Sequence, residues 1–153
     1  GCIAADPDFL RGLRATTERH GIVLIFDEVM TSRLSSGGMQ KRLEIIPDLT
    51  VLGKYLGGGL TFGAFGGQAD IMDRFDPRNS NALPHAGTFN NNVLTMVAGL
   101  TGLRDIFTPG VAETHNARGD QFHTELATLI KEHEFPAQVT GISSLMCCTC
   151  SEV

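Results

Sequence analysis

The run of apolar residues from Ile22 to Phe26, which ends at Asp27 and Glu28, constrains the fold more than any other stretch. Its residues are mostly β-branched or aromatic, and apolar and polar positions do not alternate. This pattern predicts a strand that is buried on both faces, as in a parallel sheet covered by helices. Because open α/β sheets bind ligands at the carboxyl ends of their strands, Asp27 stands where a binding site is expected.

A second apolar run, from Leu49 to Leu52, leads into a single lysine that is framed by glycine. Gly53 precedes Lys54, and three more glycines follow at positions 57–59. Glycine has no Cβ and accepts backbone angles that other residues avoid, so a flat ligand could approach this lysine closely. An unprotonated lysine amine can form a Schiff base with a carbonyl compound. Taken alone, Lys54 could equally be a surface lysine in a turn.

A third polar element, Gly87-Thr88, stands shortly before a predicted helix over residues 92–107. Backbone N–H groups and a hydroxyl at the start of a helix can bind an anion, because helix amino-termini carry partial positive charge. A simple capping role for Thr88 is the alternative.

The remaining periodicity predicts an α/β order of elements. Asp6 and Pro7 are suited to start a helix that Gly21 ends. Thr108-Pro109-Gly110 separates two further helices, the second of which should turn its apolar residues inward. The predicted strands cover 22–26, 49–52, 63–67, 139–142 and 145–149. One predicted helix begins at Pro7, and the other predicted helices cover 40–43, 69–75, 92–107 and 108–132.

Charge and cysteine content exclude several classes of function. The net charge of −5 argues against a nucleic-acid-binding surface, which would be basic. No stretch of about 18 apolar residues is present, so no membrane partner is expected. The four cysteines do not form paired C-x-x-C clusters, so neither a disulfide framework nor a zinc site is expected. A cytoplasmic location is the expectation that follows.

Three strings carry a resemblance to a known family: L-I-F-D-E-V-M-T from residue 24, P-D-L-T-V-L-G-K-Y-L-G-G-G-L from residue 47, and H-A-G-T-F-N-N-N from residue 85. In order and spacing they resemble the class III, pyridoxal-phosphate-dependent aminotransferases, and most of all the glutamate-1-semialdehyde 2,1-aminomutase branch. Ser32-Arg33 departs from that family, which usually has Gly-Phe-Arg and one residue more.

The resemblance implies roles for five residues of the three strings. Lys54 would hold pyridoxal 5'-phosphate as an internal aldimine and shuttle the proton once released, and Asp27 would keep the pyridine nitrogen protonated; these two are the expected catalytic residues. Val29 would pack against one face of the ring. Gly87 and Thr88 would reach across a homodimer interface to the phosphate of the partner's cofactor.

The resemblance also implies the fold and the activity. We expect part of a fold type I transferase, in which residues 1–107 form the later part of a large domain with a mixed, mostly parallel sheet. Residues 108–153 would begin a smaller α+β domain. The expected reaction is amino-group transfer between an amino donor and a keto or aldehyde acceptor. The alternatives are the aminomutase reaction and a catalytically inactive dimerisation or regulatory fragment. Residues 1–153 alone are expected to be an inactive fragment.

Overall fold

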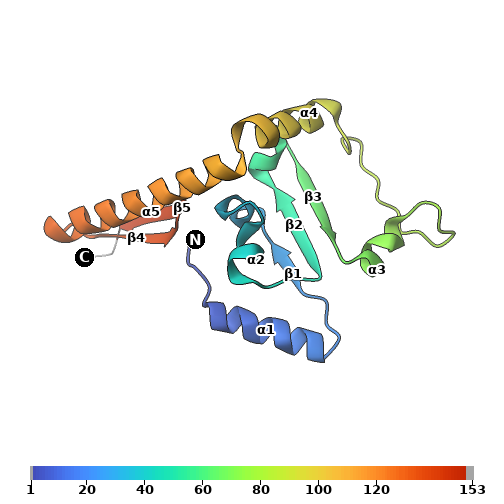
Figure 1. Ribbon diagram of the computed structural model, residues 1–153, viewed down its shortest axis with the longest axis horizontal. Coiled ribbons are helices and arrows are strands. Elements are labelled where there is room, and N and C mark those ends of the chain that lie inside the picture. Colours follow the sequence, from blue (N-terminus) through green and yellow to red (C-terminus); the bar gives the residue numbers. More distant parts are fainter. Residues whose placement is uncertain (1, 151–153) are drawn as a thin grey trace.

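The computed structural model describes residues 2–150, and its main element is a three-stranded mixed sheet in the order β1-β2-β3 (Figure 1). Strands β1 (Ile25–Asp27) and β2 (Leu49–Gly53) are parallel, with Asp27 opposite Val51. Strand β3 (Gly63–Gly67) is antiparallel to β2. The predicted α/β class and the mixed sheet are therefore confirmed, with one parallel and one antiparallel pair in the described part.

Helix α1 (Pro7–Arg19) precedes the sheet and starts as the sequence predicts. The Asp6 carboxylate accepts hydrogen bonds from the backbone N–H groups of Asp8, at 2.7 Å, and Phe9, at 3.4 Å. Such a cap satisfies N–H groups that have no partner within the helix. Gly21 follows the helix end with φ +62, a conformation that glycine adopts without strain.

Strand β1 is shorter than predicted and begins at Ile25 rather than at Ile22. The backbone N–H of Leu24 donates to the Asp48 carboxylate at 2.6 Å, so Leu24 bonds a side chain before the regular ladder begins. The prediction that this strand is buried on both faces is wrong for the described residues, because Ile25 is 52% exposed. In this part of the fold β1 lies at an edge of the sheet and not inside it.

The crossover from β1 to β2 contains a 3₁₀ helix, η1 (Thr31–Leu34), and a short helix, α2 (Gly38–Leu43). It holds most of the buried apolar side chains in the described part. Beyond β2 lie η2 (Lys54–Gly57), and beyond β3 lie α3 (Ala69–Met72) and η3 (Asp73–Phe75). The buried apolar residues are Leu24, Leu34, Leu43, Ile45 and Ala112.

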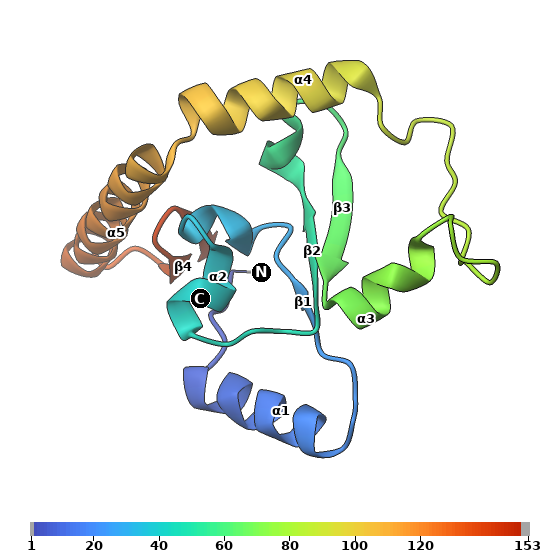
Figure 2. The same cartoon turned by 45° about the vertical axis from the view of Figure 1, so that its right-hand side comes forward.

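Helix α4 (Val93–Thr101) lies across the end of the sheet opposite to α1 (Figures 1 and 2), and it continues into a π-helical turn, η4 (Gly102–Ile106). Small residues mediate its packing on η2. A Cβ at Gly99 would lie 2.3 Å from the Leu56 carbonyl oxygen, and one at Gly58 would lie 2.4 Å from the Ala98 backbone. Gly58, one of the glycines after Lys54, therefore allows the close approach of α4. The expectation that these glycines admit a flat ligand stays a prediction.

The apolar stripe that predicted this helix is not covered in the described part. Thr95 and Gly99 are the buried residues of α4. Three residues of the stripe, Val93, Val97 and Leu100, instead form an exposed surface together with the adjacent Leu94, and we name this surface the outer face of α4. Its members are Val93, Leu94, Val97 and Leu100, between 58% and 72% exposed.

Helix α5 (Pro109–Glu132) extends away from the sheet and packs against a hairpin of β4 (Ala137–Ile142) and β5 (Leu145–Cys150) (Figure 1). Thr108 caps it, as predicted, by accepting from the Val111 backbone N–H. The prediction that the apolar residues of α5 face inward is only partly correct, because Phe122 and Leu129 are exposed. The proposed division at residue 108 stays a prediction. Within residues 2–150, no helix combines the length and the apolar character that a membrane crossing requires.

Candidate functional site

Asp27 and Lys54 lie at the same end of the sheet, where two adjacent parallel strands have their carboxyl ends. Asp27 is the last residue of β1 and stands opposite Val51, and Lys54 follows directly after β2. Val29 packs between the two strand ends, because its methyl groups lie 3.5 and 3.6 Å from the position that a Cβ would take if Gly53 had one. The structure thus brings together three of the predicted site residues, which are 27 positions apart at most in the sequence.

Lys54 has an unusual backbone conformation. Its φ is +53, in the left-handed region that side-chain-bearing residues rarely occupy. Such a conformation costs about 1–3 kcal/mol and tends to occur at functional sites, where the surrounding structure enforces it. Here Gly53 and the glycine-packed η2 fix the turn. The side chain is exposed and available to a ligand at the sheet edge.

The Asp27 carboxylate is also available to a ligand. Its Oδ1 accepts a hydrogen bond from the Val29 backbone N–H at 3.0 Å, which fixes the orientation of the side chain. Asp27 is exposed in the described part, although the resemblance implies a buried carboxylate. An oriented carboxylate, a branched apolar side chain and a strained lysine fit a pyridinium ring that carries an aldehyde.

Glu28 has a structural role beside the candidate site. It is 1% exposed, and its carboxylate accepts hydrogen bonds from the Met39 and Gln40 backbone N–H groups, at 2.9 and 2.7 Å. The Thr31 hydroxyl donates a third bond at 2.6 Å. Glu28 therefore holds the start of α2 against the end of β1, directly beside Asp27.

Gly87 and Thr88 are not brought to Asp27 and Lys54. They lie on the long loop between η3 and α4, which runs outside β3 (Figure 1), and both are exposed. Thr88 does not cap α4, because the Asn92 side chain accepts from the Thr95 backbone N–H at 3.2 Å. The capping alternative is therefore wrong. The loop lies on the far side of β2 from Asp27.

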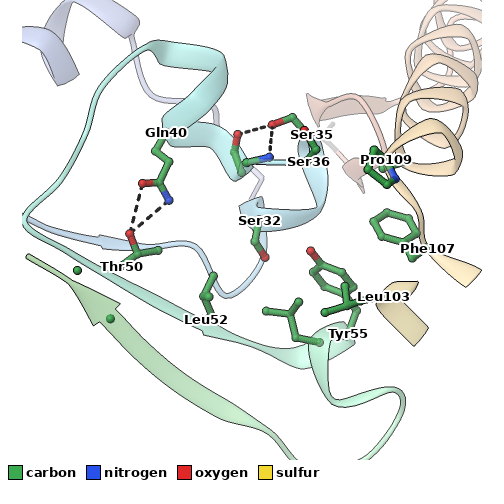
Figure 3. A pocket seen from close by; sticks show the side chains of 16 residues that line it. Ser32, Ser35, Ser36, Gln40, Thr50, Leu52, Tyr55, Leu103, Phe107 and Pro109 are labelled. Atoms are coloured by element: carbon green, nitrogen blue, oxygen red, sulfur yellow. Dashed lines mark hydrogen bonds between the residues drawn. The ribbon is translucent and has the colours of Figure 1, made fainter. Parts of the chain in front are cut away.

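A cavity of about 560 Å³ lies beside η1 and β2, and Figure 3 shows the residues that line it. Thr50 and Leu52 point into it, so it faces the side of β2 opposite to Val51 and Gly53. The buried Ser32 hydroxyl in its wall has no hydrogen-bond partner in the described part. Every lining residue is uncharged, and neither Asp27 nor Lys54 is among them.

Two further residues have roles that the sequence did not reveal. Asp48 joins three segments through the Leu24 N–H, the Gln68 amide at 2.6 Å and the Arg14 guanidinium at 3.0 Å. The Leu24 hydrogen bond, followed by Arg14 and Gln68, holds the pKa of Asp48 below its usual range. His85 packs edge-on against Phe65, with 5.4 Å between ring centroids. The role of Asp48 could have been inferred from its position, because this carboxylate stands directly before the apolar strand β2.

The family of aminotransferases of class III matches residues 1–152 of the chain, and the chain belongs to this family. The family depends on pyridoxal phosphate. A solved transaminase with pyridoxal phosphate bound is similar to this chain with a TM-score of 0.90 and 32% identity, covering 99% of this chain and 36% of that one.

Relatives with named activities refine the position within the family. A β-phenylalanine transaminase from Variovorax paradoxus is 52% identical over 95% of this chain and 33% of its own length. A solved β-phenylalanine aminotransferase from the same species superposes with a TM-score of 0.94 and 50% identity, over 100% of this chain and 35% of the other. The chain thus spans about a third of the length of these relatives.

The expectation that the aminomutase branch is the most similar is corrected by these identities. The glutamate-1-semialdehyde 2,1-aminomutase 2 of Brevibacillus brevis is 41% identical over 96% of this chain and 34% of its own length. This value is lower than the 52% found with the β-phenylalanine transaminase.

Proposed function

We propose that the protein transfers amino groups with pyridoxal 5'-phosphate as cofactor, and that Lys54 and Asp27 are its catalytic residues. The observation that carries the proposal is the placement of the two residues at the carboxyl ends of adjacent parallel strands, with Lys54 in a strained turn. The cofactor, when bound, supplies an electron sink for the charge left on a substrate carbon that loses its proton.

The residues of the chain have separate tasks in this proposal. Lys54 holds the cofactor covalently and afterwards carries the proton from the substrate carbon that bears the amino group. Asp27, held in place by the Val29 N–H, keeps a proton on the ring nitrogen through a charge-assisted hydrogen bond. Val29 gives the ring an apolar surface against Gly53.

The proposed amino donors are β-amino acids, and the acceptors are keto acids or aldehydes. The name and the 52% identity of the β-phenylalanine transaminase support this choice over the aminomutase reaction. A panel with β-phenylalanine, α-amino acids and glutamate-1-semialdehyde as substrates separates the two activities. Turnover of the semialdehyde alone would favour the aminomutase reaction. No turnover of any substrate by the full-length protein would favour the alternative of a catalytically inactive dimerisation or regulatory role.

The same proposal includes a homodimer in which Gly87 and Thr88 contact the phosphate bound by the partner subunit. Two observations support it: Thr88 lies in an exposed loop beyond β3, and the outer face of α4 beside it is uncovered. Apolar surface of this kind is typical of protein interfaces.

The attachment of the cofactor can be tested directly. Borohydride reduction of the protein incubated with pyridoxal phosphate, followed by peptide mass mapping, should place the label on Lys54. Lys41→Ala is the matched control, because Lys41 lies in α2, within the crossover, and donates to Ser36 Oγ at 2.9 Å. It should keep the label, and Lys54→Ala should lose it. A label on Lys41 or Lys131 would refute the assignment.

A further inference from the structure

Strand β5 carries three of the four cysteines, and their places along the strand divide them into two groups. Cys148 and Cys150 are two residues apart, so their side chains point to the same face, and Cys147 points to the other. Cys148 and Cys150 are exposed, and all four cysteines are free thiols. The proposed amino-transfer chemistry uses none of them.

A disulfide between Cys148 and Cys150 does not fit an extended strand. Two residues of an antiparallel strand span about 6.8 Å between Cα atoms, and the Cβ atoms of one face are separated by a similar distance. A disulfide needs Cβ atoms about 3.5–4.5 Å apart. The pairing of Cys148 with Val139 and of Cys150 with Ala137 keeps β5 extended. The two thiols therefore lie side by side on one face, separated by a gap that a sulfur–sulfur bond cannot close.

A single metal ion between the sulfurs can close the same gap. With metal–sulfur bonds of about 2.3 Å, two thiolates in a line lie about 4.6 Å apart. Each sulfur then has to lean toward the other by only about 1 Å relative to its Cβ. The chemical question is which ion accepts two thiolates without a ligand from the facing strand.

The surroundings of the pair answer that question. The cross-strand neighbours Val139 and Ala137 offer no further ligand, and the next side chain along this face of β5 is that of Met146, whose thioether is itself a soft sulfur ligand. Among residues 2–150, no group of three or more His, Cys, Asp or Glu side chains is placed to hold a metal ion. Zinc in structural sites takes four ligands, so zinc is disfavoured. Soft thiolate ligands select Cu(I), which accepts linear coordination by two sulfurs.

We propose that Cys148 and Cys150 form a two-thiolate site for a soft monovalent cation of the Cu(I) type on the exposed face of β5. Binding replaces the two thiol protons with one ion, so each Cu(I) bound releases two protons and leaves a site with one negative charge. No electron is transferred. The site is independent of the proposed amino-transfer function.

The test uses Cu(I) itself, added without oxygen to the full-length protein in the presence of a chromophoric Cu(I) chelator as competitor. Native mass spectrometry counts the ions, and the chelator absorbance gives the affinity. Cys148→Ser and Cys150→Ser should each weaken binding by about 100-fold or more, because the second thiolate acts as an intramolecular ligand. Cys147→Ser is the matched control and should bind like the unchanged protein.

The outcomes separate the proposal from its rivals. Equal binding by the unchanged protein and by Cys148→Ser or Cys150→Ser would overturn it, as would loss of binding in Cys147→Ser. Zn(II) binding as tight as Cu(I) binding would also overturn it, because it would require ligands beyond the pair. Circular dichroism of each variant shows whether the fold is retained. Retained amino transfer in all three serine variants would confirm that the site is separate from Lys54.

Discussion

Asp48 joins three segments of the fold, and its replacement by asparagine should lower the stability of the protein in a pH-dependent way. The Asp48 Oδ2 atom accepts from the Leu24 N–H at 2.6 Å and lies 3.0 Å from Arg14 Nη1. The side chains of Arg14 and Asp48 are 19% and 10% exposed, so water screens the pair only in part. Asparagine keeps the shape and one acceptor oxygen but removes the charge.

The magnitude follows from these contacts. A hydrogen bond to a charged group contributes about 1.5–3 kcal/mol and a neutral one about 0.5–1.5 kcal/mol, a difference of about 1 kcal/mol for each bond. Two bonds, from Leu24 and Arg14, lose this assistance. The Gln68 amide can turn and present its oxygen to the new amide group. We therefore expect Asp48→Asn to lower the free energy of unfolding by about 2 kcal/mol at pH 7.

The pH dependence has a defined sign. Because the pKa of Asp48 is lowered in the folded state, its stabilising contribution is present above the unfolded value of about 3.9. It is lost as the pH falls further, through the folded pKa. The difference between the unchanged protein and Asp48→Asn should therefore shrink below about pH 4.

Urea unfolding followed by far-ultraviolet circular dichroism measures this effect. With an m-value of about 2 kcal/mol/M, a loss of about 2 kcal/mol moves the midpoint by about 1 M. Asp70→Asn is the control, because Asp70 is exposed in the first turn of α3 and should change the midpoint little. An equal loss in both variants, or a difference that persists unchanged at pH 3, would refute the reasoning.

Three further predictions address the site and the packing around it. Asp27→Asn should still bind pyridoxal phosphate, seen in its absorbance, but should lose most amino transfer, since an amide cannot hold the ring proton; near-normal turnover would leave Asp27 a structural role only. Thr88→Ala should weaken cofactor binding by about 1–2 kcal/mol in an absorbance titration. Dimers that combine it with Lys54→Ala should regain one active site, and failure in confirmed mixed dimers would place Thr88 in its own subunit's site. Gly58→Ala should lower the thermal midpoint more than Gly59→Ala, because both have positive φ but only a Cβ at Gly58 meets the Ala98 backbone, at 2.4 Å. Equal effects would show that backbone strain alone decides.

Local signals in the sequence predicted most of the elements. Asp6-Pro7 and Thr108-Pro109 start helices where they were expected, and the apolar run before Lys54 forms β2. These signals are short-range, since a cap or a turn depends on residues within a few positions. The placement of Asp27 and Lys54 at one edge followed from the general geometry of parallel strands.

The faces of the elements could not be predicted from the sequence in the same way. The apolar stripe of α4 predicted a buried side, yet Thr95 and Gly99 are the buried residues of this helix, and Gly99 packs against η2. The apolar residues before Asp27 predicted a strand covered on both sides, yet Ile25 is half exposed. The spacing of apolar residues shows which face of a helix or strand is apolar, but it does not show which other segment packs against that face. The chain spans about a third of the length of its relatives.

The buried Glu28 carboxylate has a consequence for the energetics of cofactor binding. It fixes the amino end of α2 through Met39 and Gln40, and so orders the crossover between the strands that carry Asp27 and Lys54. Ordering one residue of backbone costs about 1–2 kcal/mol of conformational free energy. Because folding has already met this cost for the crossover, a ligand that docks between the two strand ends binds to preorganised groups, and its binding energy is not spent on assembling them.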